Sequence, residues 1–150
     1  MSQTSSIPAA SQAVLNAMRG AEQELIDRLC EANGMGAGVT DEVYRRQDLV
    51  QFFAGLLSML RARLEQPPEI AAEIEDDFFE AVVQGVLQQG TSYRDIVAGS
   101  NVTYMTLAIA LLDRTAPEQR AEAQKLLTGL TSGWFGRVTD AIIAHAKNAP

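Results

Sequence analysis

The sequence contains few of the residues that most often build catalytic and metal centres. It has one cysteine, one histidine and one tryptophan among its 150 residues. A single cysteine excludes a disulfide within the chain and suits a reducing compartment. A single histidine excludes the repeated Glu-x-x-His pairs of di-iron bundles. The chain also has no GxSxG elbow, Cys/His cluster or dinucleotide fingerprint. We therefore expect a protein that is not an enzyme and that holds no metal or other cofactor.

Positive charge is also scarce. Twelve Lys and Arg residues stand against 19 Asp and Glu residues, which gives a net charge of −7 and a pI of about 4.6. Binding to nucleic acid or to anionic lipid needs clustered basic residues, and those of this chain are scattered. The N-terminus has neither the positive region nor the apolar region of a secretory signal. These features predict a cytoplasmic protein that binds neither nucleic acid nor membrane.

Strand signals are missing, because no run of β-branched residues alternates with period two. Apolar residues recur instead at intervals of three, four and seven, which is the helical period. Helix stop and start signals separate these stretches, notably at Pro67-Pro68, Gly90 and Thr115-Ala116-Pro117. We predict an all-α fold, a five-helix bundle, with a flexible tail at 1–6 and a single helical domain at 7–147.

The individual helices follow from these signals. The first is expected from about residue 8 to residue 33, before a glycine-rich loop at 34–38, and Thr40 is expected to cap the second. The last segment keeps one apolar stripe throughout and predicts a single long helix after an N-cap at Thr115, although three glycines each weaken it by roughly 1 kcal/mol. The third helix, about 69–89, should bury one stripe: Ile70, Ile74, Phe78, Ala81, Val82 and Val86.

The segment 96–112 carries no charged residue, and apolar positions run nearly all round its helical wheel. Such a helix is normally buried among other helices. A membrane span asks for roughly 20 predominantly apolar residues, whereas this segment is shorter and includes a serine, an asparagine and two threonines. We therefore predict a buried central helix at about 93–113 in the bundle.

Polar groups inside this central helix are the candidate site. Ser100, Asn101, Thr103, Tyr104 and Thr106 place hydroxyls and an amide in an otherwise apolar segment. Buried polar groups must be satisfied, so these groups either bond to neighbouring protein groups or face a ligand. On the second interpretation, a ligand-binding pocket lies between the helices. We predict that it is lined by Tyr93, Ser100, Tyr104 and Trp134.

Acidic residues on the third predicted helix offer a rival site. Glu73, Asp76, Asp77 and Glu80 lie on one side of that helix, and two carboxylates at helical spacing can bind a divalent metal. Carboxylate metal sites in bundles draw ligands from several helices, however. We interpret the row as a solvated helix face and predict no metal site.

The histidine and the cysteine also have two interpretations each. His145 lies on the apolar stripe near the end of the last helix, where a haem ligand would be poorly held. We interpret it as a capping or half-buried histidine whose charge suits the helix dipole. The sequence predicts no basic side chain that would activate Cys30, so we interpret it as a small core thiol and not as a nucleophile.

The segment 78–96 has a helix, a glycine at Gly90, a cap at Thr91-Ser92 and a second helix that begins near Tyr93. This junction resembles that of helical bacterial sensor domains, and it is similar to the non-haem, globin-like N-terminal domain of stressosome RsbR-type proteins. The resemblance implies a globin-like fold, a dimer, no haem and signalling through protein contacts. It supplies no motif residues to carry over.

Two functions are compatible with these observations. The first is a cytoplasmic bacterial sensory or protein-interaction module that acts through helix–helix contacts, with a homodimer and a signalling protein as partners. The second is a helical domain that binds a small apolar ligand or chromophore beside the central helix.

Overall fold

The computed structural model describes residues 7–34 and 43–148, and all regular structure in these residues is helical. The predicted tail 1–6, the loop after Gly34 and the cap at Thr40 lie outside the described residues. The elements in chain order are α1 (Ala9–Met18), α2 (Glu22–Ala32), α3 (Val43–Glu65), α4 (Pro68–Gln88), α5 (Tyr93–Asp113), the 3₁₀ turn η2 (Pro117–Gln119) and α6 (Arg120–Asn148). The predicted all-α class is confirmed.

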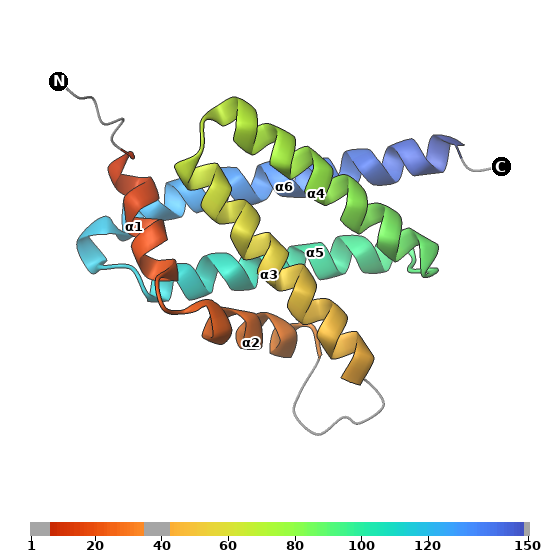
Figure 1. Cartoon of the computed structure of the whole chain (residues 1–150), viewed down its shortest axis with the longest axis horizontal. Helices are drawn as coiled ribbons and strands as arrows, with labels where there is room; N and C mark the ends of the chain where they lie inside the picture. The colour runs from red at the N-terminus through yellow and green to blue at the C-terminus, as the bar shows by residue number, and fades with distance from the viewer. Residues whose placement is uncertain (1–6, 35–42, 149–150) are drawn as a thin grey trace.

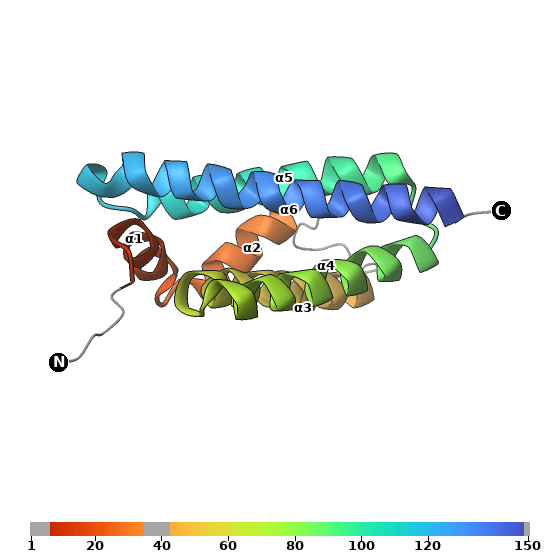
Figure 2. The same ribbon diagram turned by 90° about the horizontal axis from the view of Figure 1, so that it is seen from above.

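Two helical hairpins form two layers (Figures 1 and 2). α5 and α6 lie side by side in one layer, and α3 and α4 form the other. α2 lies between α3 and α5, and α1 packs across the end of the bundle against α3, α5 and α6. The core lies between the two layers, where Phe53, Leu107, Leu111 and Leu127 are fully buried or nearly so.

The first predicted helix is divided in two, so the described residues contain six α-helices and not five. Gly20 breaks it with a φ of 71°, a conformation that glycine adopts without steric cost. The apolar period continues across the break, and Val14, Met18, Leu25 and Leu29 are all buried. The prediction of one helix was wrong because both halves keep the same period.

Most of the other boundary signals act as predicted. Ser92 Oγ accepts a hydrogen bond from the Asp95 backbone N–H at 3.1 Å and caps α5. Gly90 has a φ of 85° at the end of α4. The prediction for Thr115 was wrong: its hydroxyl is buried and donates to the Leu111 carbonyl oxygen at 2.7 Å. It therefore satisfies a carbonyl in the last turn of α5 and does not cap α6, which runs as one helix in spite of its three glycines.

The buried stripe of α4 differs from the predicted one. Ile70 and Ile74 are exposed, with 46% and 38% of their surface accessible, and Ala81 is exposed as well. The buried residues lie one position further along the helix: Ala71, Glu75, Phe79 and Val83. Phe78 and Val86 are partly buried and pack against the core, so the prediction was wrong only in part. It failed at the centre of the stripe because it excluded a glutamate from the core.

α5 has the predicted bounds but is not buried on all sides. Its inner face, with Thr103, Tyr104 and Leu107, packs against the rest of the bundle, whereas Met105 and Ile109 are exposed. Among the described helices, only α5 is long and apolar enough to cross a membrane by length and composition, a test that core helices of soluble proteins also pass. The prediction of a fully buried helix was wrong for the outer face.

Candidate functional site

A cavity of about 620 Å³ lies between α3, α4 and α5, and we call it the α3–α5 pocket. Phe52, Val82 and Val86 form part of its apolar wall, and Ser100, Thr103 and Tyr104 form a polar strip along α5. Its volume is within the range of about 300–1,000 Å³ that is usual for small-molecule sites. The pocket therefore has the size and the mixed lining of a ligand site.

The helix itself brings the polar strip together. Residues three and four apart share one face of a helix, so Ser100, Thr103 and Tyr104 point the same way. The Asn33 side-chain amide, at the end of α2, donates to Thr103 Oγ1 at 3.1 Å and to the Leu29 carbonyl at 2.8 Å. These bonds satisfy a buried threonine and fix the side of the pocket next to α2.

Tyr104 is one of the two buried residues of the strip, with 4% of its surface exposed. Burial raises the pKa of its phenol well above the ordinary value of 10.0, and a hydrogen bond with Ser100 only partly offsets this. The phenol therefore stays neutral at physiological pH. Because a Tyr–Ser pair has two O–H groups and uses one between its members, it keeps one further donor.

Trp134 lies behind the pocket and does not line it. Its ring centroid is 5.6 Å from that of Tyr104 and 6.3 Å from that of Phe79, and the residue is almost fully buried. Two of the four predicted site residues, Ser100 and Tyr104, thus line one cavity. Trp134 packs against Tyr104 from behind and does not reach the cavity.

Tyr93 lies elsewhere. It is eleven residues from Tyr104, which places it on the same side of the helix but roughly 16 Å away along the axis. Its hydroxyl is 2.6 Å from Nδ1 of His145, and the two rings meet edge to face. Both residues are exposed, so the half-buried alternative for His145 was wrong, although the residue does lie in the last turn of α6.

Glu75 is a buried charge that the sequence analysis missed. Arg63 Nε donates to Oε2 at 2.8 Å and Arg63 Nη2 to Oε1 at 2.5 Å, while the Trp134 indole N–H donates to Oε2 at 3.1 Å. Arg137 Nη2 lies 3.5 Å from Oε1. The sequence does contain a signal for Glu75: it lies four residues from both Ala71 and Phe79, and these three residues share the buried stripe of α4.

The environment of Glu75 keeps it ionised. Burial alone raises the pKa of this carboxyl, but the hydrogen bonds from Arg63 and Trp134 and the charges of Arg63 and Arg137 outweigh burial, so its pKa is lowered. The bidentate contact joins α3 to α4, and the indole contact joins α4 to α6. Glu75 therefore links the α3–α4 layer to α6 in the other layer.

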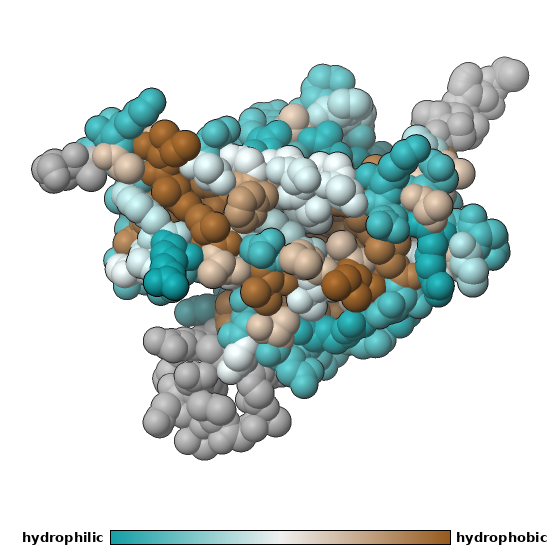
Figure 3. All heavy atoms as spheres, turned by 180° about the vertical axis from the view of Figure 1, so that it is seen from behind, coloured by the Kyte–Doolittle hydropathy of each residue, from teal (hydrophilic) through white to brown (hydrophobic). Residues whose placement is uncertain are grey.

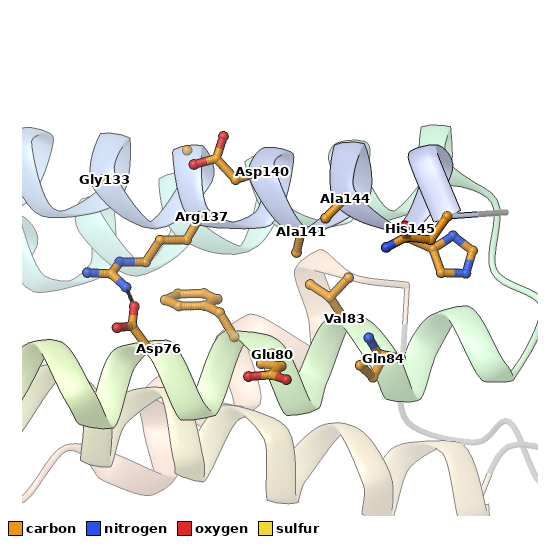
Figure 4. Close-up of a pocket in the computed structure, with 13 residues that line it drawn as sticks. Asp76, Glu80, Val83, Gln84, Gly133, Arg137, Asp140, Ala141, Ala144 and His145 are labelled. Atoms are coloured by element: carbon orange, nitrogen blue, oxygen red, sulfur yellow. Dashed lines mark ion pairs between the residues drawn. The ribbon is translucent and has the colours of Figure 1, made fainter.

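A groove of about 880 Å³ lies between α4 and α6 (Figure 4). Arg137 reaches from α6 to Asp76 on α4 and forms an ion pair with it. Glu73, Asp77 and Glu80 are exposed, as expected of a solvated face. Within the described residues, no three His, Cys, Asp or Glu side chains gather as they would to hold a metal ion.

The side of α5 and α6 that faces away from α3 and α4 carries apolar patches among residues of intermediate hydropathy (Figure 3). We call it the α5–α6 outer face. On α5 it exposes Val102, Met105 and Ile109, with 39%, 55% and 50% of their surfaces accessible. Beside them is a shallow groove of about 570 Å³ whose lining includes Ala98 and Phe135.

Cys30 is fully buried on α2, as the interpretation of a core thiol requires. Because the thiol is buried, a reagent or metal ion at the surface does not reach it.

Comparisons with protein-family models, with curated proteins and with solved structures gave no match for this chain.

Proposed function

We propose that the protein is a cytoplasmic protein-interaction module that acts as a homodimer, with two copies joined through their α5–α6 outer faces. The observation that carries the proposal is the exposed stripe of Val102, Met105 and Ile109 on a helix without charge between residues 96 and 112. Contiguous apolar surface of this kind marks an interaction site in a soluble protein.

The distribution of charge leaves α5 as the surface on which a second copy meets least repulsion. The chain carries a net charge of −7, so most contacts between two copies would bring like charges together. The stripe avoids this cost because it is uncharged over its whole length. Two copies can therefore approach along α5 with less repulsion than along α4, where Glu73, Asp77 and Glu80 are exposed.

The stripe is also complementary to itself. If two α5 helices pack antiparallel about the point between residues 103 and 104, a two-fold axis relates them. Val102 of one copy then lies level with Met105 of the partner subunit, and Ile109 lies level with Ala98 of the partner subunit. The small side chain of Ala98 leaves room for the larger Ile109, which allows the helices to interdigitate there.

The ends of α5 add a matching charge. In the same register, Arg94 of one copy lies level with Asp113 of the partner subunit. Arg94 is exposed, and Asp113 is exposed as well, with a long contact of 3.6 Å to Arg28. A pair of this kind at each end favours the antiparallel arrangement over a parallel one, which would place like charges together.

The groove beside Ala98 supplies the receiving surface. It lies between α5 and α6, and Val97, Ala98, Asn101 and Phe135 contribute to its lining. In the proposed register, the partner subunit's Ile109 enters this groove. The resemblance of segment 78–96 to RsbR-type sensor domains extends the proposal, because it implies a globin-like fold, a dimer and signalling through protein contacts.

The test is the mass of the protein in solution and of an Ile109→Glu variant. We expect the unchanged chain to be a dimer at micromolar concentration by sedimentation equilibrium. The variant buries two unpaired carboxylates at the interface and should weaken dimerisation on the order of a hundredfold. A monomer for the unchanged chain up to high micromolar concentration contradicts the proposal.

Ile70→Glu is the matched control. Ile70 is nearly as exposed as Ile109 but lies on α4, outside the proposed interface. It should leave the dimer intact, and equal loss in both variants would show that the effect is not specific to α5. Co-sedimentation with phosphatidylcholine vesicles tests the lipid alternative: a monomer that binds vesicles through Ile109 would overturn the proposal.

A further inference from the structure

The α3–α5 pocket has features that the proposed dimer does not use. It lies on the inner face of α5, opposite the stripe of Val102, Met105 and Ile109, and is lined mainly from α3, α4 and α5. Two of its polar residues, Thr103 and Tyr104, have less than 5% of their surface exposed. We infer that this pocket binds an uncharged small molecule with a long apolar body and a hydroxyl or similar hydrogen-bonding group at one end.

The apolar body follows from the walls. Phe52 on α3 stacks on Phe78 of α4 with ring centroids 5.7 Å apart, and Phe52 lines the pocket together with Val82 and Val86. Gly85 and Gly99 widen the space, since neither contributes a side chain to it. An alkyl or isoprenoid chain placed here removes apolar surface of both partners from water.

The hydrogen-bonding end follows from the polar strip. Asn33 uses its amide N–H groups on Thr103 and Leu29 and keeps its carbonyl oxygen as an acceptor. The Tyr104–Ser100 pair keeps one O–H as a donor. A ligand hydroxyl can donate to the first and accept from the second, so a single group satisfies both sides of the strip.

The absence of ligand charge follows from the charged residues of the lining. Among the described residues that line the pocket, the only charged ones are Asp48 and Asp95, and both are exposed. They repel a carboxylate or phosphate. An ammonium group beside the buried hydroxyls of Thr103 and Tyr104 would lack a buried counter-charge. The neutral phenol of Tyr104 completes a site whose inner end is polar and uncharged.

The chain contains its own reporter for this site. Trp134 is the only tryptophan, and its ring contacts that of Tyr104, which lines the pocket. A molecule that enters the pocket therefore changes the fluorescence of a single residue, and calorimetry on the same samples gives the stoichiometry.

The experiment compares three ten-carbon probes: 1-decanol, decanoate and decylamine. We expect 1-decanol to bind one molecule per chain and to change the Trp134 emission, and the two charged probes to bind about tenfold more weakly. Absence of saturable binding by 1-decanol overturns the inference. Equal or tighter binding of decanoate or decylamine overturns the assignment of an uncharged ligand.

A pair of glycine substitutions places the bound probe. Gly85 lies on the pocket wall, and a Cβ at this position meets no atom within 4 Å, so Gly85→Leu fills the pocket without a clash at the backbone. Gly129→Leu is the matched control on α6, outside the pocket, and it also has open space. We expect Gly85→Leu alone to lose binding by about tenfold or more, with a melting temperature no lower than that of Gly129→Leu.

Equal binding by the two leucine variants would place the probe elsewhere and overturn the inference.

Tyr104→Phe tests the polar end, because it removes the hydroxyl and keeps the ring. It should weaken 1-decanol several-fold, and unchanged affinity would contradict the role of the strip. None of these outcomes depends on dimerisation, since Ile109→Glu should bind 1-decanol as the unchanged chain does.

Discussion

The two faces of α5 are similar in hydropathy and different in surroundings. The inner face carries Tyr104 and Leu107, buried against the other helices, and the outer face carries Met105 and Ile109, both about half exposed. The hydroxyls of Thr103 and Tyr104 lie on the inner side, where protein partners satisfy them. The exposed side of α5 is thus about as apolar as the buried side, whereas the exposed side of an ordinary amphipathic surface helix is polar.

This difference shows how to interpret an uncharged helix. A segment without charge is compatible with burial on all sides, with a membrane or with two different protein contacts. In α5 the polar residues separate these alternatives, because Thr103 and Tyr104 need the bundle around them. The outer face, where Met105 and Ile109 are exposed and Asn101 can bond to water, is the face that is left for a partner.

The largest effect should come from truncation on the inner face. Leu107→Ala removes a side chain that is 1% exposed and should lower the free energy of unfolding by about 3–4 kcal/mol. Met105→Ala, two residues away on the outer face, should change it by less than about 0.5 kcal/mol. Urea denaturation of both in an Ile109→Glu background excludes a contribution from dimer dissociation. Similar losses for both would remove the distinction between the faces.

The second effect tests what holds the inner face against the opposite layer. Arg63→Met leaves Glu75 buried without its bidentate partner, and only Arg137 and the Trp134 indole remain. We expect a loss of about 3 kcal/mol in the free energy of unfolding, at the lower end for a broken buried pair. Arg61→Met, on the same helix but exposed, should be nearly neutral in the same denaturation experiment.

A smaller effect should reach both faces equally. Ser92→Ala removes the hydroxyl that accepts from the Asp95 N–H at the start of α5 and should cost about 1 kcal/mol. Hydrogen exchange should then speed up in the first turn of α5 on its inner and outer sides alike. Faster exchange on one side only would indicate that the cap acts through packing and not through the helix end.

The smallest effect should appear on acidification. The pKa of Glu75 is lowered in the folded protein, so its contribution to stability is complete above the unfolded value of about 4.5 and is lost as the pH falls through the folded value. The difference in unfolding free energy between the unchanged chain and Glu75→Gln should therefore shrink below pH 4.5. A constant difference between pH 7 and pH 3 would show that Glu75 does not titrate as its contacts require.

Much of the fold could be predicted because its signals are local. The bounds of α5 follow from Ser92 and from the apolar run, and the junction between α3 and α4 follows from Pro67-Pro68. The break at Gly20 was missed because the apolar period continues through it. The stripe of α4 was misplaced because the partners that allow Glu75 to be buried lie on α3 and α6, at separations of 12 and 59 residues.

The candidate site could be predicted only in part for a related reason. Ser100 and Tyr104 are four residues apart on one helix, and this spacing alone places them side by side. Tyr93 has the same orientation on the helical wheel but lies three turns away, and a wheel contains no information about distance along the axis. Trp134 comes from another helix, so only packing could decide whether it lines the pocket or supports it.

The contact between Arg114 and α1 has a consequence for the folding of the chain during its synthesis. Its Nε donates to the carbonyl of Ala17 at 2.9 Å, across 97 residues of sequence, and α1 packs on α5 and α6 as well as on α3. A ribosome adds about 5–20 residues per second, so the first helix waits on the order of 10 s before the last one emerges. During that interval Val14 and Met18 have no completed site, and α1 offers an apolar target to a chaperone.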